Sequence, residues 1–232
     1  RETAARVAAG AIAKLLLNEL NIDIKSGICE IDGIKADNFN FENARNSEIF
    51  ALDSNVEDAQ KNAILKAKNS HNSVGGVALI NVKNCPVGLG EPIYHKLDAQ
   101  IANAMMSINA VKAVEIGDGI LASRVLGFDN NDQIRKSGFK TNHSGGILGG
   151  ISNGDDINVK VYFKATPSIF IEQETVDIYG NEVECKLKGR HDPCVAIRGS
   201  VVAESMISLV IADMLLLNMS SKVENIKKVY AK

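Results

Sequence analysis

The sequence contains no tryptophan, and only 5% of its residues are aromatic. Proteins that bind single-stranded nucleic acid stack the bases on aromatic side chains, so this scarcity argues against such a platform. Charge of one sign is not in excess either, because 26 basic and 28 acidic residues leave a formal net charge of −2. The whole chain therefore gives no electrostatic reason to expect nucleic acid or an anionic membrane as a partner.

The sequence also lacks paired cysteines and long hydrophobic runs. Its four cysteines show no C-x-x-C pair and no zinc spacing, which is typical of reduced thiols in a cytoplasmic protein without a metal site. Cys194 is interpreted as a small buried residue rather than a nucleophile. The longest apolar stretch, residues 206–219, is interrupted by polar residues, so we expect neither a membrane span nor a signal peptide.

What is present is enough apolar material for a sizeable core, since 45% of the 232 residues are hydrophobic. Strands and long helices are mixed without a strict βαβ rhythm, which favours an α+β fold with helices packed against antiparallel sheets. Periodicity predicts strands over residues 22–31, 74–82, 111–116 and 157–163, and helices over residues 3–20, 53–68, 94–107, 193–218 and 223–229. Thr3 and Asp53 are the predicted N-caps, and residues 35–47 and 128–141 are predicted loops.

Residues 189–194, Gly-Arg-His-Asp-Pro-Cys, are the most informative stretch of the chain. Arg190 could clamp a phosphate, and His191 and Asp192 could transfer protons. Pro193 suits the first turn of the helix that follows. An aspartate before a helix is also a common N-cap. Asp192 could therefore transfer a proton, cap the helix or do both.

Two other segments suggest a binding site. Residues 142–154 hold five glycines, and glycine lets backbone N–H groups approach an anion or a flat ring, although a tightly packed connection is the alternative. Lys164, Thr166 and Ser168 follow the end of a predicted strand, and Pro167 stiffens the turn. One lysine and two hydroxyls suit a phosphate, and a solvated lysine beside a capped turn is the alternative.

Taken together, residues 1–11, 88–112, 142–169 and 189–206 resemble the chorismate synthases, and the resemblance extends to about residue 217. The resemblance implies the 1,4-anti elimination of phosphate from 5-enolpyruvylshikimate 3-phosphate with reduced FMN. It also implies a homotetramer in which helices are packed between antiparallel sheets.

The same resemblance implies roles for particular residues. Asp192 matches the candidate base, which in the family is thought to act through N5 of the flavin. His191 is interpreted as a structural neighbour, and Arg198 is a doubtful member because it lies on another helical face. The positions that match FMN contacts are Asn109, Ala110, Gly149, Lys164, Ala165, Thr166, Pro167, Ser168 and Arg190. Ala165 departs from the pattern, because proline is common there.

The chain begins inside a signature that normally reads Ser-Gly-Arg-x-Ser-x-Arg-Glu-Thr, with only Arg1, Glu2 and Thr3 present. The catalytic histidines of the family belong to motifs upstream of this point. We therefore expect residues 1–232 to be the C-terminal portion of a single domain, inactive alone. A folding and oligomerisation unit without a ligand site is the alternative. For the enzyme, we expect Arg190, Asp192, Lys164 and the glycine-rich bend to surround one hollow the size of an isoalloxazine ring.

Overall fold

The structure, a computed structural model, describes residues 2–231 and is built around one five-stranded sheet. Its strand order is β2-β1-β3-β9-β4, and every pairing is antiparallel. The strands are β1 (Asp23–Ile31), β2 (Ile34–Lys35), β3 (Gly76–Lys83), β4 (Val111–Ile116) and β9 (Ile157–Phe163). The predicted α+β class with antiparallel pairing is confirmed.

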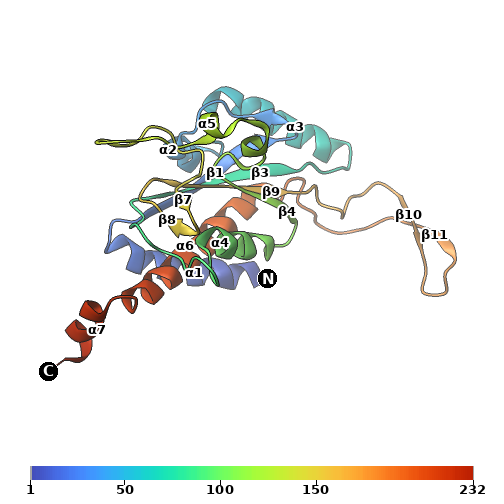
Figure 1. Cartoon of the computed structure of the whole chain (residues 1–232). Helices are drawn as coiled ribbons and strands as arrows, with labels where there is room; N and C mark the ends of the chain where they lie inside the picture. Colours follow the sequence, from blue (N-terminus) through green and yellow to red (C-terminus); the bar gives the residue numbers. More distant parts are fainter. Residues whose placement is uncertain (1, 232) are drawn as a thin grey trace.

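Helices cover both faces of this sheet (Figure 1). Helices α2 (Phe41–Asn46) and α3 (Ser54–Asn69) lie over one face, and α1 (Glu2–Asn18), α4 (Leu97–Met106) and α6 (Ala196–Met219) lie over the other. The central strand β3 is buried along seven of its eight residues because it has a helical layer on each side. Strand β9 alternates instead, with Ile157, Val159, Val161 and Phe163 buried in the larger core.

Helix α6 organises that core, as its apolar character predicts. It packs on α1, α4 and strands β1 and β3, and Gly10 of α1 lies directly against Ser205 of α6. Among the described residues, it is also the one helix long and apolar enough to cross a membrane. Half of its most apolar 18-residue stretch is buried inside the protein. This burial fits the core helix of a globular fold.

Several predicted boundaries differ from the structure for local reasons. Helix α1 begins at Glu2, so Thr3 lies inside the first turn and is not the cap. The predicted loop over residues 35–47 contains α2, because the Asn40 side chain accepts hydrogen bonds from the N–H groups of Glu42 and Asn43. The cap at Asp53 is confirmed. The predicted loop over residues 128–141 contains only the end of a short helix and a hairpin whose two strands have two residues each.

The remaining elements are short. They are the 3₁₀ helix η1 (Gly119–Arg124), α5 (Gly127–Asn130), α7 (Val223–Tyr230) and the hairpins β5–β6 (Ile134–Arg135, Gly138–Phe139), β7–β8 (Ile147–Leu148, Ile151–Ser152) and β10–β11 (Gln173–Val176, Glu182–Cys185). The β10–β11 hairpin extends away from the body (Figure 1). No second large sheet occurs within residues 2–231, so the full sandwich stays an expectation for a longer protein.

Candidate functional site

Three of the predicted segments meet at the end of β9. This strand pairs with β3 and β4 in antiparallel register, and Phe163 lies opposite both Gly76 and Val111. The residues that precede β3 and β4 therefore gather where β9 ends. The Lys164 N–H donates to the Ala110 carbonyl at 2.9 Å. The sheet register thus brings Lys164 beside Ala110, far apart in the sequence.

The loop that carries Asp192 joins the same corner. The Thr166 hydroxyl donates to the Asp192 carbonyl at 3.0 Å, and the Ser73 hydroxyl donates to the Thr166 carbonyl at 2.7 Å. The Val74 N–H donates to the Pro193 carbonyl at 2.8 Å. The Ser73 and Thr166 hydroxyls and the Val74 N–H, the first and last of which lie just before β3, therefore hold Thr166 and residues 192–193 together.

A small cavity of about 70 Å³ lies in this corner, lined in part by Ser168, Phe170 and Asp192. The His191 ring packs on Phe170 with 5.1 Å between the ring centroids. Its Nε2 is buried without a hydrogen-bond partner in the described part of the chain. A buried polar atom without a partner is uncommon in folded proteins and fits a place where a polar group of a ligand binds.

Asp192 does not cap the helix that follows it. Helix α6 begins at Ala196, four residues later, and its N-cap residue Val195 makes no side-chain capping bond. The Asp192 carboxylate instead lies 3.2 Å from the guanidinium of Arg198. Arg198 therefore contacts the candidate base, although it was expected on another helical face.

The cations of the corner are available to an anion. Lys164 and Arg190 are exposed, and neither takes part in an ion pair within residues 2–231. Thr166 and Ser168, which follow Lys164 in the chain, are partly buried, and Ala165 and Pro167 are exposed. This donor set fits a phosphate or another anionic ligand group.

Asn109 and Ala110 lie in the turn between α4 and β4. Ala110 has a φ of +72°, a left-handed conformation that is uncommon for alanine. The Asn109 amide donates to Glu2 at 3.2 Å, and Glu2 also accepts from Arg6. Sequence reasoning gave no role to Glu2 or Arg6, although both stand in the first segment of the family resemblance. Arg1, which precedes them in the signature, lies outside the described residues.

Gly149 is not in this corner. It forms the turn of the β7–β8 hairpin, and the neighbouring Gly150 carbonyl accepts from Leu97 at the start of α4. Ala110 lies beyond the other end of α4, whose ten residues span about 15 Å. Ala110, Lys164, Thr166 and Asp192 are therefore linked by hydrogen bonds, and Gly149 lies apart from them. The small cavity is lined by Ser168 and Asp192 but not by Ala110, Lys164 or Arg190, so it is not the single hollow that was expected.

The glycines of that bend have two kinds of surroundings. Cβ atoms added at Gly145 and Gly146 would meet backbone atoms of Gly117 and Asp156, so tight packing explains these two positions. A Cβ added at Gly149 would meet nothing within 4 Å, although its φ is +61°. Gly149 is thus exposed, and its turn is free to contact a ligand.

Cys194 is buried beneath the corner. Burial raises the pKa of its thiol, partly offset by hydrogen bonds from the N–H groups of Ala196 and Ile197. A raised pKa disfavours the reactive thiolate. The interpretation of Cys194 as a small buried residue is therefore supported over that of a nucleophile.

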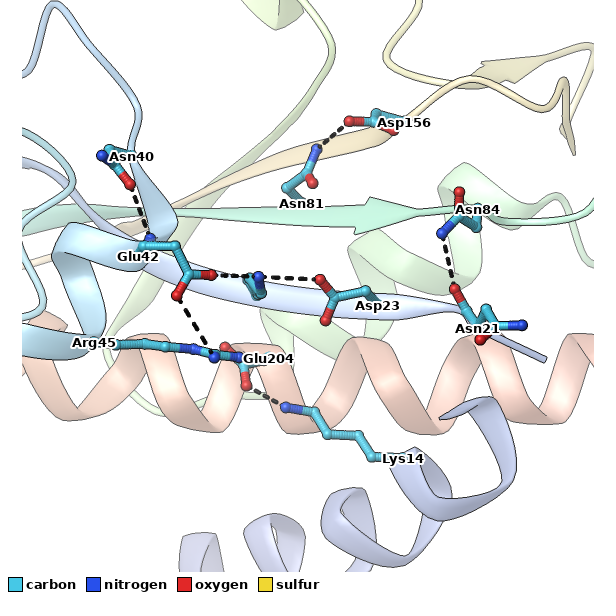
Figure 2. A network of polar contacts seen from close by, with 11 residues as sticks. Lys14, Asn21, Asp23, Asn40, Glu42, Arg45, Asn81, Asn84, Asp156 and Glu204 are labelled. Carbon is cyan, nitrogen blue, oxygen red and sulfur yellow. Dashed lines mark hydrogen bonds and ion pairs between the residues drawn. The ribbon is translucent and has the colours of Figure 1, made fainter. Parts of the chain in front are cut away.

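A separate polar network lies between α1, α2, α6 and β1 (Figure 2). Lys25 is 2.6 Å from Glu42 and 3.3 Å from Asp23, and Lys14 pairs with Glu204. Of these residues, Lys14, Asp23, Lys25 and Glu204 line a cavity of about 370 Å³. Each of these lysines already has a carboxylate partner, so this cavity is less suited to an anion than the corner at Lys164.

The fold and the corner define an α+β protein with a donor-rich site for an anionic ligand. The family model described as chorismate synthase matches residues 1–216. A chorismate synthase of Aliarcobacter butzleri is 83% identical over 232 residues, and one of Sulfurimonas denitrificans is 64% identical over the same length. A crystal structure of chorismate synthase superposes with a TM-score of 0.79 at 33% identity and covers 98% of this chain.

The chain belongs to the chorismate synthase family. All 232 residues align with both curated relatives, but the chain spans only 65% of the length of either relative. It likewise covers 67% of the chain in the solved structure.

Proposed function

We propose that this chain supplies the FMN-binding part of a chorismate synthase. The whole enzyme would eliminate phosphate from 5-enolpyruvylshikimate 3-phosphate to give chorismate, as a homotetramer in the cytoplasm. The observation that carries the proposal is the convergence of residues 109–110, 164–168 and 192 at the end of β9. These are three of the segments on which the family resemblance depends.

The side chains of the corner fit an anionic flavin nucleotide. Lys164 and Arg190 are exposed and form no ion pair within residues 2–231, and the Thr166 and Ser168 hydroxyls follow Lys164 in the chain. Arginine presents a planar fork that matches a phosphate, and lysine presents a point charge that can reach a carbonyl edge. When bound, reduced FMN supplies transient electron density to the elimination without net redox change.

Asp192 is the candidate base, which would accept a proton during the elimination. Its main chain is fixed by Thr166, and its carboxylate is oriented by Arg198. Both contacts hold the carboxylate at the rim of the cavity, where it is partly exposed and within reach of a bound molecule. A base held in place before substrate binds has less freedom to lose in the reaction.

A titration of the 232-residue chain with FMN tests the proposal. We expect saturable binding, measured by quenching of flavin fluorescence. Lys164→Ala is expected to weaken it roughly tenfold, the equivalent of about 1.4 kcal/mol. Lys83→Ala is the matched control, because Lys83 is an exposed lysine at the far end of β3. Equal affinities for the two variants would contradict the assignment of Lys164.

The alternative function is a folding and oligomerisation unit without a ligand site. One observation favours it: Ile12 and Leu15 of α1 are 70% and 68% exposed, as expected of a helix that packs on further protein. No FMN binding by the unsubstituted chain, together with an intact oligomer in light scattering, would support this alternative over the flavin site.

A further inference from the structure

Arg6 connects three helices through one guanidinium. Its Nε lies 2.6 Å from a Glu2 oxygen, its Nη1 donates to the Ser107 hydroxyl at 2.6 Å, and its Nη2 donates to the Ser107 carbonyl at 3.2 Å. Nη1 also contacts the Met206 sulfur on α6 at 3.8 Å. Ser107 is the C-cap residue of α4, so the positive charge lies at the carboxyl end of a helix, where it is stabilising.

The same contacts reach the candidate flavin site through Glu2. One Glu2 oxygen accepts from Arg6, and the other accepts from the Asn109 amide at 3.2 Å. Arg6 therefore holds the turn formed by residues 107–110 at two points, directly at Ser107 and through Glu2 at Asn109. Both contacts come from α1, which is about a hundred residues away in the sequence.

This turn needs support because Ala110 adopts a left-handed backbone conformation. Such conformations persist in residues other than glycine only where the surroundings over-determine them. The Ala110 carbonyl also accepts from the Lys164 N–H at 2.9 Å. The turn is thus held between the Arg6–Glu2 pair and the strand end that carries Lys164.

We propose that Arg6, paired with Glu2, is a positioning residue that fixes the Ser107–Ala110 turn so that Asn109 and Ala110 face the flavin. This inference rests on the proposed FMN site. Arg6 acts through the turn and is not assigned a contact with the flavin. A purely structural role in α1–α6 packing is the competing explanation, because Arg6 also touches Met206.

The test compares Arg6→Lys with Lys14→Met in the 232-residue chain. Lysine keeps the charge and most of the stem but cannot reach Glu2 and both Ser107 oxygens at once. Lys14 pairs with Glu204 across the same α1–α6 interface and makes no contact with the turn. We expect Arg6→Lys to weaken FMN binding roughly tenfold, a change of about 1.4 kcal/mol, while Lys14→Met leaves the affinity unchanged. Similar losses of melting temperature without a difference in affinity would overturn the inference.

A double-mutant cycle shows whether Arg6 acts through Asn109. If it does, Arg6→Lys combined with Asn109→Ala weakens FMN binding no more than the stronger single substitution, whereas independent effects add. Additive losses would overturn the proposed route through Glu2.

Hydrogen exchange keeps the inference separate from the FMN site. The Lys164 amide is protected by its bond to Ala110, and we expect Arg6→Lys to accelerate its exchange without flavin, while Lys14→Met does not. If the chain binds no FMN but this acceleration is observed, the proposed site fails and the support of the turn by Arg6 stands. Unchanged exchange in Arg6→Lys would contradict that support.

Discussion

The carboxylate of Asp53 ties two parts of the chain together. One oxygen caps α3 by accepting from the Asn55 N–H at 3.0 Å, and the other accepts from the N–H groups of Asp37 and Asn38, each at 3.1 Å. These bonds, those from Asn55 and Asn38 foremost, hold the pKa of Asp53 below its usual value. A single side chain thus anchors both the start of a helix and the loop after β2.

The lowered pKa sets the direction of a pH effect. A carboxyl whose pKa is lower in the folded protein stabilises it above the unfolded pKa of about 3.9, and the contribution is lost as pH falls through the folded pKa. An asparagine amide has one accepting oxygen, so Asp53→Asn cannot both cap α3 and accept from the Asp37 and Asn38 N–H groups. We expect it to lower Tm at pH 7 by about 2–4 °C and to reduce the loss of stability between pH 5 and pH 3. Thermal unfolding across this range measures both effects.

Asp58→Asn is the control for this prediction, because it removes the same charge from an exposed position of α3. An identical pH profile for the two variants would show that the carboxylate of Asp53 has no special part in stability.

The packing of α1 on α6 depends on a small residue at the contact. A Cβ added at Gly10 would lie 2.5 Å from the Ser205 Cβ and 2.7 Å from the Ser205 carbonyl oxygen. A backbone atom cannot move aside as a flexible side chain can, so the two helices would have to separate. Because α6 organises the core, this separation would affect the whole larger core.

Gly10→Ala is therefore expected to destabilise the protein, although alanine is the better helix former. Overpacking is expected to cost about 1–3 kcal/mol. The roughly 1 kcal/mol that alanine gains in a helix offsets part of this cost, and the overlap with backbone atoms places the expected cost toward the upper end of the range. Gly127→Ala is the control, since an added Cβ there meets nothing within 4 Å. Urea unfolding measures both variants, and a Gly10→Ala chain as stable as the control would refute the close contact.

The molecule exposes apolar side chains that further protein could cover. Helix α1 buries Ala13 and Leu17 against the core but exposes Ile12 and Leu15, and the chain spans 65% of the length of its relatives. We expect the 232-residue chain alone to form no chorismate from 5-enolpyruvylshikimate 3-phosphate and reduced FMN. Measurable turnover by the chain alone would contradict the dependence on residues outside it.

Turnover is expected when the chain is joined to the part of the Aliarcobacter butzleri relative that it does not span. In that assembled protein, Asp192→Asn should reduce turnover by roughly 10²-fold or more, the contribution typical of a general base, with FMN affinity nearly unchanged. Asp213→Asn, an exposed substitution on the same helix α6, should leave both unchanged. Equal losses of turnover and affinity in Asp192→Asn would indicate a structural role instead.

Short-range patterns were sufficient for much of this protein. The alternation in β9, the apolar α6 and the Asp53 cap depend on neighbours a few residues away, and each was predictable without coordinates. The family was recognisable in the same way, because its motifs are contiguous segments. Helix α2 was missed because its start depends on one asparagine in a polar stretch.

Long-range contacts determined the rest. The register of β9 against β3 and β4 brings Lys164 to Ala110 and Asp192, and the length of α4 separates Gly149 from them. The start of α6 at Ala196 pairs Asp192 with Arg198, and α1 carries Arg6 to Ser107. Asp192 and Arg198 are close in the sequence, and their pairing depends on where α6 begins. The Thr166–Asp192 and Arg6–Ser107 contacts join residues 26 and 101 positions apart, so they depend on how strands and helices pack and no local pattern encodes them.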